Sequence, residues 1–286
     1  MVHISHAHKK FKEHLNKSGK SPHTIRSYEK HIDDLVNFLL EMKKEHAHLV
    51  TKDDLKKFIA KAGKKKSAKS INAKTVALKS FFRFLEMNEY ITENPAHALE
   101  YLKEKETKPR ILSVVEYRAL RDTAKNDIRY YAIIELMLQT GITIGEVTRI
   151  KLSDLHLKND AKLDIRDRKE KLNRSIPLNS SAKKAIEEYL EVRPKAKSET
   201  LFITRTGKAI DPRNIRMTID SCYKKAGIKD ARVHDLRHTF CAHHLKKGTS
   251  IAAVAYMAGH KNLNTTRKYL EFTKSPEMEE IEKNSL

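Results

Sequence analysis

Apolar residues in the first hundred positions recur at intervals of three or four, with polar residues between them, as on one face of a helix. Ser21 followed by Pro22 is typical of a helix start, because serine caps free N–H groups and proline fits the first turn. The apolar positions that follow are Ile25, Tyr28, Ile32, Leu35 and Phe38. A second amphipathic helix is predicted over 71–85, with an apolar side made of Val76, Leu78, Phe81, Phe82 and Leu85. Together with a short helix after the acidic cap at 51–54, about four helices fill this region.

A polar stretch follows this helical region and predicts a domain boundary. Residues 104–110 contain no apolar side chain and include Pro109, which favours an extended linker. Ser113 followed by Glu116 is a capping-box pattern and indicates a new helix just beyond it. We therefore expect an N-terminal domain over 1–103, a linker over 104–111 and a C-terminal domain over 112–286.

The C-terminal domain is predicted to be mostly helical with a small antiparallel sheet. A strongly apolar helix over 131–138 ends at Thr140-Gly141, and a further helix over 180–190 is capped by Ser180. Between them, residues 161–178 alternate between apolar and polar positions around the charged turn 168–171, which indicates a β-hairpin with a cationic tip. The expected fold class is therefore mostly α.

The charge balance predicts a polyanionic partner. The chain has 286 residues with 58 Lys plus Arg against 37 Asp plus Glu, a net charge of +21. No apolar run reaches the roughly 18 residues that span a bilayer, and no signal-peptide pattern opens the chain, so a cytoplasmic protein without a membrane partner is expected. Two cysteines alone argue against a disulfide framework.

The last third of the chain carries the candidate chemistry. His234 and Arg237 are three positions apart, so on a helix they share one face, where a guanidinium can bind two phosphate oxygens. Gly259-His260 and Tyr269 follow. A tyrosine oxygen can displace an alkoxide from phosphorus and keep the phosphate as an ester, which allows later resealing.

The same region allows a rival chemistry. The spacings of His234, His238, Cys241 and His244 would let some of these side chains bind zinc from one helix face. The acidic ligands and the water-activating carboxylate of a metallohydrolase are not obvious. A metal-dependent nuclease therefore remains an alternative.

The order His-x-x-Arg, Gly-His, Tyr resembles the tyrosine recombinase (phage integrase) family, of archaeal or bacterial Xer type. The resemblance implies a SAM-like core-binding domain before the catalytic domain, and no metal or other cofactor. It implies that Tyr269 is the nucleophile and that Arg237, His234 and His260 stabilise the phosphate, with His234 as a candidate proton acceptor. Lys169, before Arg174-Ser175-Ile176-Pro177, matches the lysine that protonates the leaving 5′ oxygen.

The resemblance also implies partners. Duplex DNA with an inverted-repeat site and a homotetramer are expected, and the tail 275–286 either docks on a neighbouring protomer or frays. Expected DNA contacts are Lys64, Lys65, Lys66, Lys69 and Arg174, although a lysine run can also be plain surface charge. Chromosome-dimer resolution and integration of a mobile element use the same chemistry, so the biological role stays open.

One expected arginine is missing. The family's Thr-Gly-x-Arg-x-x-Glu segment aligns with residues 140–146 and puts Thr143 at the arginine position. By analogy with other arginines in phosphoryl transfer, the absence of this arginine lowers the cleavage rate by a factor on the order of 10³ to 10⁵. An engineered substitution, a naturally weakened paralogue, or replacement by another cation such as Arg149 would each explain it. A DNA-binding relative that barely cleaves is therefore a further alternative.

Overall fold

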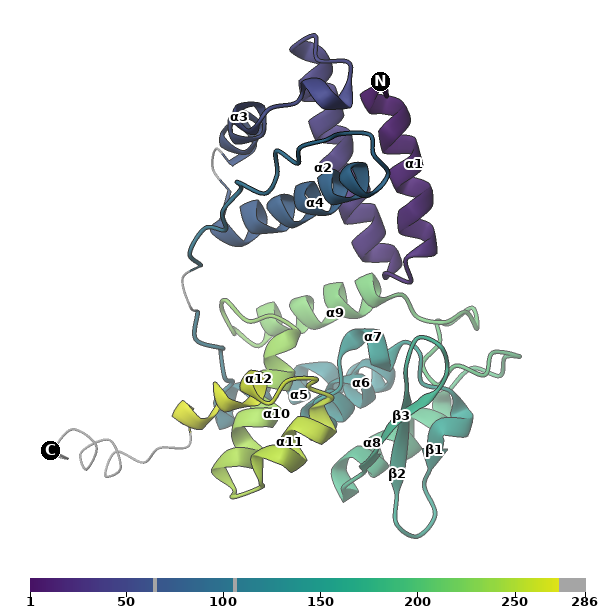
Figure 1. Ribbon diagram of the computed structural model, residues 1–286. Helices are drawn as coiled ribbons and strands as arrows, with labels where there is room; N and C mark the ends of the chain where they lie inside the picture. Colours follow the sequence, from purple (N-terminus) through teal and green to yellow (C-terminus); the bar gives the residue numbers. More distant parts are fainter. Residues whose placement is uncertain (64–65, 105–106, 273–286) are drawn as a thin grey trace, which may run out of the picture. The chain divides into compact units, whose positions relative to one another are not determined.

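The computed structural model describes residues 1–63, 66–104 and 107–272. The chain divides into two compact units, Met1–Glu106 and Thr107–Leu286, and the division falls within the stretch expected as a linker. Figure 1 labels the elements. They are α1 (Ile4–Lys17), α2 (Pro22–Glu41), η1 (Ala47–Leu49), α3 (Lys52–Gly63), α4 (Ala68–Met87), α5 (Val114–Ala124), α6 (Ile128–Thr140), α7 (Ile144–Val147), η2 (Leu152–Asp154), β1 (Leu155–His156), β2 (Lys162–Arg166), β3 (Leu172–Pro177), α8 (Ser180–Val192), α9 (Pro212–Lys225), α10 (His234–Lys246), α11 (Ile251–Ala258), α12 (Asn264–Arg267) and η3 (Leu270–Phe272).

The first unit contains α1 to α4 around one apolar core. Helix α2 begins as predicted, because the Ser21 hydroxyl accepts a hydrogen bond from the Thr24 N–H and Pro22 is the first helical residue. The predicted apolar side of α4 is confirmed for Leu78, Phe81, Phe82 and Leu85, which are all fully buried. It is wrong for Val76, which is 38% exposed. Two positions along a helix are about 200° apart, so Val76 faces away from Leu78.

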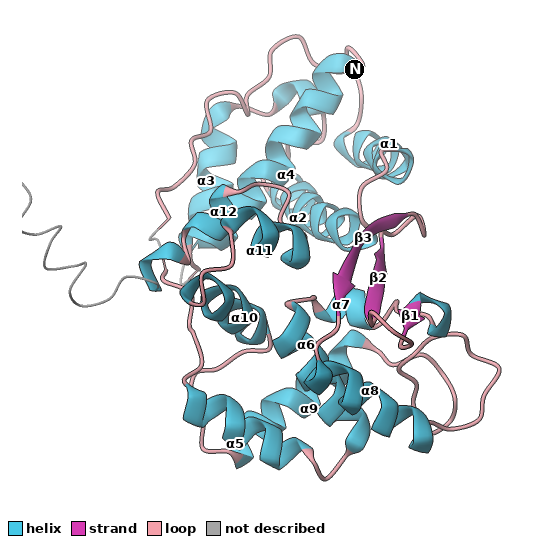
Figure 2. Cartoon of the chain, turned by 90° about the horizontal axis from the view of Figure 1, so that it is seen from below, coloured by secondary structure: helices cyan, strands magenta, loops and turns pink. Residues whose placement is uncertain are grey.

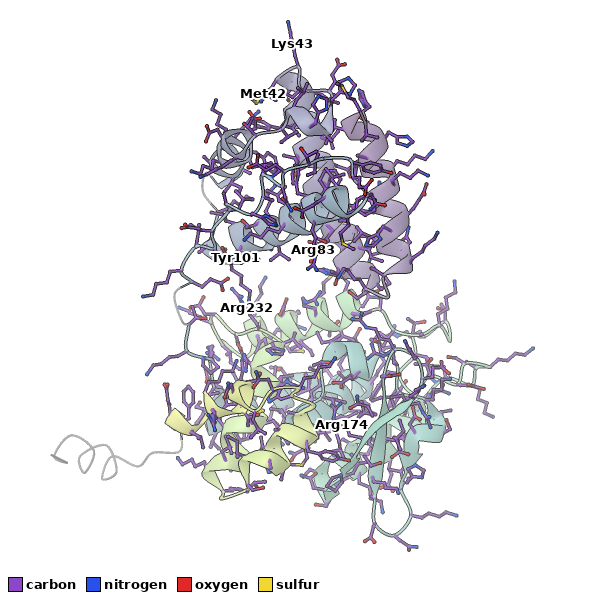
Figure 3. All side chains as sticks on the ribbon, viewed as in Figure 1. Met42, Lys43, Arg83, Tyr101, Arg174 and Arg232 are labelled. Carbon is purple, nitrogen blue, oxygen red and sulfur yellow. The ribbon has the colours of Figure 1, made fainter. Side chains whose placement is uncertain are left out.

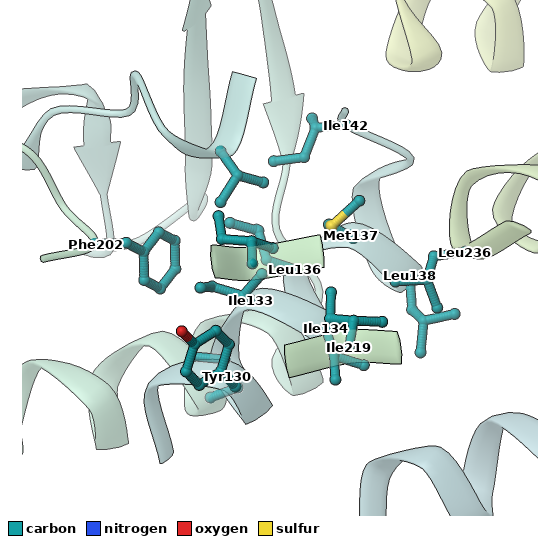
Figure 4. Packing of buried hydrophobic residues seen from close by; sticks show 14 of the residues in the cluster. Tyr130, Ile133, Ile134, Leu136, Met137, Leu138, Ile142, Phe202, Ile219 and Leu236 are labelled. Atoms are coloured by element: carbon teal, nitrogen blue, oxygen red, sulfur yellow. The ribbon is translucent and has the colours of Figure 1, made fainter. Parts of the chain in front are cut away.

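The core of the second unit is built around α6, as the sequence predicts. Its residues Ile133, Ile134, Leu136 and Met137 are buried among side chains from other helices (Figure 4). The helix ends at Gly141, whose backbone has a φ of +67° in the left-handed region. Glycine adopts this conformation without a Cβ penalty, so it stops the helix and turns the chain.

The helix starts of the second unit follow the predicted capping chemistry with one difference. The capping box at the start of α5 is confirmed in both directions between Ser113 and Glu116. The cap of α8 is Asn179 and not Ser180, because the Asn179 side chain accepts the Ala182 N–H at 3.0 Å. Ser180 is therefore the first helical residue.

The predicted hairpin is present, and its strands lie together in one part of a mostly helical chain (Figure 2). Strands β2 and β3 are antiparallel, with Leu163 opposite Ile176 and Ile165 opposite Arg174. All four of these side chains point to the buried face. Strand β1 pairs with β2 and was not predicted, because two residues carry too little alternation to be recognised. Within the described ranges, no helix is long and apolar enough to cross a membrane.

Candidate active site

The residues expected to handle a phosphate come together around Tyr269. Helix α10 begins at His234 and carries Arg237 and His238 within its first turns. Tyr269 follows α12, and its phenol oxygen lies 2.6 Å from Nδ1 of His238. The Tyr269 side chain is only 1% exposed, so the phenol is held inside the protein in this structure.

The imidazole that contacts the phenol belongs to His238, whereas the sequence suggested His234. His234 was the expected neighbour, but its ring packs edge-on against the His238 ring, with centroids 4.6 Å apart. His238 follows one helical turn later on the same face of α10, and it is this second ring that reaches Tyr269. The signal was in the sequence, since a histidine directly follows Arg237.

Burial controls the protonation of this cluster. It raises the pKa of the Tyr269 phenol well above its usual value of 10.0, and Arg237 opposes the rise only in part. Burial, with help from the nearby His234 and Lys268, lowers the pKa of His238 to about 4. At neutral pH the phenol therefore keeps its proton and His238 is neutral. Its Nδ1 can then accept the phenol proton if the ring carries its own proton on Nε2.

Arg237 is a buried cation fixed by the backbone. Its side chain is 94% buried, and Nη1 donates to the Gly141 carbonyl at 2.8 Å. This bond ties α10 to the end of α6. Burial lowers the pKa of Arg237 from its usual value, but a guanidinium stays protonated in proteins. The remaining N–H groups carry the positive charge that a phosphate needs.

His260 lies against the same tyrosine. It follows Gly259, and its Nδ1 lies 2.7 Å from the Thr266 hydroxyl, which orients the ring. The ring is stacked on Tyr269 at 11°, with centroids 6.3 Å apart. Burial, together with Arg237, lowers the pKa of His260 to about 4, so this imidazole is also neutral at pH 7.

Arg174, which the sequence suggests as a DNA contact, is buried and paired within the protein. Its side chain is buried, forms an ion pair with Oε1 of Glu146 at 2.7 Å, and donates to the carbonyls of Met257 at 2.9 Å and Ala258 at 3.5 Å. A Cβ on Gly259 would lie 2.6 Å from Nη1 of Arg174, so only glycine permits this approach. Arg174 faces the core side of the hairpin, and the expected DNA contact stays a prediction. Arg174 supports the loop that carries His260.

Lys169 lies apart from this cluster. It is exposed at the turn between β2 and β3, where its backbone N–H donates to Oδ1 of Asp167 at 2.7 Å. Its side chain makes no hydrogen bond or ion pair with any residue that the structure describes. The structure therefore does not bring Lys169 to Tyr269.

Thr143, at the position of the missing arginine, caps a short helix. Its hydroxyl donates to Oε2 of Glu146 at 2.9 Å, and the backbone N–H of Glu146 returns a bond to it at 3.3 Å. The hydroxyl is therefore committed to a capping box. Helix α7 ends at Val147, so Arg149 lies beyond it.

The lysines expected to contact DNA belong to the first unit. Lys64 and Lys65 lie outside the described residues. Lys66 and Lys69 are exposed, and Lys66 lines a pocket of about 440 Å³ together with Lys30 and Lys74. The tail 275–286, expected to dock or fray, also lies outside the described residues.

The side chains considered for zinc do not converge. His238 contacts Tyr269, and Cys241 is buried, which raises the pKa of its thiol to about 11. His244 packs on the Phe240 ring at 4.5 Å. Over residues 1–63, 66–104 and 107–272, no three His, Cys, Asp or Glu side chains are placed to hold one metal ion.

Known proteins match the chain over most of its length. Residues 101–275 match the phage integrase family, and residues 9–89 match the phage integrase N-terminal SAM-like domain. The chain is 33% identical over 263 residues to tyrosine recombinase XerC of Staphylococcus carnosus, covering 87% of this chain and 86% of that protein.

Solved structures share the fold at lower sequence identity. The XerH site-specific recombinase, in a post-cleavage complex with a palindromic difH substrate, has a TM-score of 0.78 at 20% identity and covers 91% of this chain and 79% of that one. A lambda integrase tetramer bound to a Holliday junction has a TM-score of 0.77 at 18% identity, with coverages of 94% and 77%. With the family match and the XerC similarity, these findings mean that the chain belongs to the tyrosine recombinase (phage integrase) family and is of Xer type.

Proposed function

We propose that this protein cuts and rejoins duplex DNA at a specific site through a covalent bond between Tyr269 and a 3′ phosphate. One observation carries the proposal: a tyrosine hydroxyl lies 2.6 Å from a neutral imidazole, beside a second imidazole and a buried arginine. A nucleophile, a proton acceptor and a cation for the phosphate are what transesterification at phosphorus needs. Family membership supports the same chemistry.

Residues of this chain account for each proton transfer and each bond change in the proposed reaction. The phenol oxygen of Tyr269 attacks phosphorus while its proton passes to Nδ1 of His238, and the bond from phosphorus to the 5′ oxygen breaks. Arg237, His234 and His260 bind the nonbridging oxygens, where negative charge spreads in the transition state. Lys169 gives a proton to the 5′ oxygen. The hairpin has to bring Lys169 to the DNA for this step, and the buried phenol has to become accessible.

The proposed substrate and assembly follow from charge and from the relatives. The net charge of +21 suits a phosphate backbone, and Lys66 and Lys69 are exposed cations of the first unit. The similar lambda integrase is a tetramer on a Holliday junction, and the XerH substrate is palindromic. We infer an inverted-repeat site bound by four protomers in the cytoplasm.

Covalent trapping on a nicked suicide substrate tests the proposal. The nicked strand loses the short fragment that carries the 5′ hydroxyl, so the covalent adduct accumulates. We expect an adduct with the unaltered chain and none with Tyr269→Phe, which keeps the ring but lacks the nucleophile. A Tyr269→Phe protein that still forms the adduct, or that fails to bind the site bound by the unaltered chain, would contradict the assignment.

A second candidate function is DNA binding without efficient cleavage. It is favoured by Thr143, whose hydroxyl is bound to Glu146 and which brings no positive charge. In this case the unaltered chain forms almost no adduct, and Thr143→Arg forms it readily. The same suicide substrate therefore separates the two candidates.

A further inference from the structure

A pocket of about 530 Å³ opens in the second unit where the arginine is missing. Thr143 and His234, at the start of α10, both line it. Two arginines line the same pocket, Arg216 on α9 and Arg232 just before α10. Since His234 belongs to both, the pocket borders the candidate active site.

The guanidinium groups of this pocket are available to an anion. Arg216 and Arg232 are both exposed, and neither forms an ion pair within 4.0 Å among the residues described. Asp220, on α9, also lines the pocket and is the one carboxylate among the described residues that line it. Asp235 bonds to the backbone N–H of Arg232 at 2.7 Å and leaves the side chain unoccupied. The pocket therefore keeps an excess of positive charge.

The other nearby arginines are less suited to replace the missing one. Arg174 is buried in its ion pair with Glu146. Arg149 lies beyond the end of α7 and does not line the pocket. Arg237 is fixed beside Tyr269 by its hydrogen bond to the Gly141 carbonyl. These contacts leave Arg216 and Arg232 as the candidates on the Thr143 side.

We propose that Arg232, together with Arg216, binds nonbridging oxygens of the scissile phosphate from this pocket and supplies the guanidinium that Thr143 lacks. Arg232 is the principal cation because it is only two residues from His234. Arg216 assists from α9. The inference rests on the proposed cleavage reaction. A guanidinium stabilises the transition-state charge whichever element delivers it, provided that it reaches the same oxygens.

Single-turnover cleavage of the suicide substrate at saturating protein tests the inference, since saturation removes any effect on DNA affinity. We expect Arg232→Ala to lower the cleavage rate at least about 10²-fold, the usual loss when one transition-state donor is removed. Arg216→Ala should lower it less. Millimolar guanidinium ion should restore part of the Arg232→Ala rate, whereas sodium chloride at the same concentration should not.

The matched control is Arg213→Ala. Arg213 is an exposed arginine one turn earlier on α9 and does not line the pocket, so its loss removes the same charge and should leave the saturated rate unchanged. The Arg232 variant should fold, because its backbone N–H and carbonyl, which bind Asp235 and Tyr223, are retained. If Arg232→Ala cleaves like the unaltered chain at saturation and only binds DNA more weakly, the inference is wrong.

The variant Thr143→Arg distinguishes a failure of this inference from a failure of the function on which it rests. If the unaltered chain does not cleave but Thr143→Arg does, the proposed chemistry stands and the replacement by Arg232 is wrong. If neither cleaves a site that both bind, the cleavage function itself fails and the inference fails with it.

Discussion

At Tyr269, the proposed nucleophile, the surroundings keep the proton on the phenol oxygen. Burial raises the pKa of the phenol, and the positive charge of Arg237 only partly offsets this. The proton therefore needs an acceptor that is neutral at working pH. His238 meets this condition, since burial and its cationic neighbours lower its pKa to about 4. The same burial that protects the phenol from water thus keeps the partner imidazole in its neutral form, which has a lone pair that can accept a proton.

The lowered pKa of His238 predicts a pH dependence of stability. Between the unfolded value of 6.5 and about 4, the unfolded chain binds a proton at this position and the folded chain does not. Stability is therefore lost as the pH falls through this window. His238→Gln cannot titrate, so its free energy of unfolding should fall less between about pH 7 and about pH 4.5. Urea unfolding of the DNA-free proteins at the two pH values measures the free energy of unfolding of the unaltered chain and of the variant. His260 and the other histidines remain in the two proteins, and an equal loss in both would contradict the account.

The sequence predicts which side chains come together better than which of them touch. The pattern that contains His234, Arg237, His260 and Tyr269 selects four side chains, and the structure brings all of them to one place. It does not tell which imidazole touches the phenol, because that depends on how the segment after α12 packs on α10.

At the scale of elements, capping and close contacts fix the ends of helices around the site. Gly141 ends α6 and its carbonyl accepts a hydrogen bond from Arg237, so one glycine both stops a helix and positions a buried cation. Gly259 ends α11 and leaves room for Arg174. Capping boxes and apolar periods were readable in the sequence because they are local. The burial of Arg174 could not be read from the sequence. The alternation of a strand does not show which charged side chain has a buried partner.

The close contact at Gly141 predicts a large effect of a single methyl group. Gly141→Ala places a Cβ at 2.3 Å from the Phe240 ring, in addition to the strain of a left-handed backbone. Gly227→Ala is the matched control, because its φ is +69° and no atom of the described residues lies within 4 Å of the added Cβ. Both share the backbone cost, so Gly141→Ala should lose about 1–3 kcal/mol more, the usual cost of overpacking. Urea unfolding measures the difference, and equal losses would argue against tight packing there.

At the scale of the whole molecule, the chain has two units with separate cores and a large net positive charge. One cluster of buried apolar side chains lies in the first unit, and the clusters around α6 and α10 lie in the second. The division into helical regions was predictable because a polar, proline-containing stretch separates two sets of amphipathic helices. The charges of Lys66 and Lys69 make no contribution to either core, which leaves them free to bind phosphate.

This surface charge predicts how DNA binding responds to salt. Each phosphate contact releases counterions, so the logarithm of the association constant should fall linearly with the logarithm of the salt concentration, by about 0.9 per contact. Replacing both Lys66 and Lys69 by glutamine should make the slope shallower by about 1.8, twice that contribution. Lys10→Gln is the control, since Lys10 already pairs with Glu13 at 3.6 Å and should alter the slope little. Fluorescence anisotropy on a labelled duplex over a salt series measures the slopes. An unchanged slope in the double variant would mean that these lysines do not contact the backbone, and a flat response of the unaltered chain would contradict DNA binding itself.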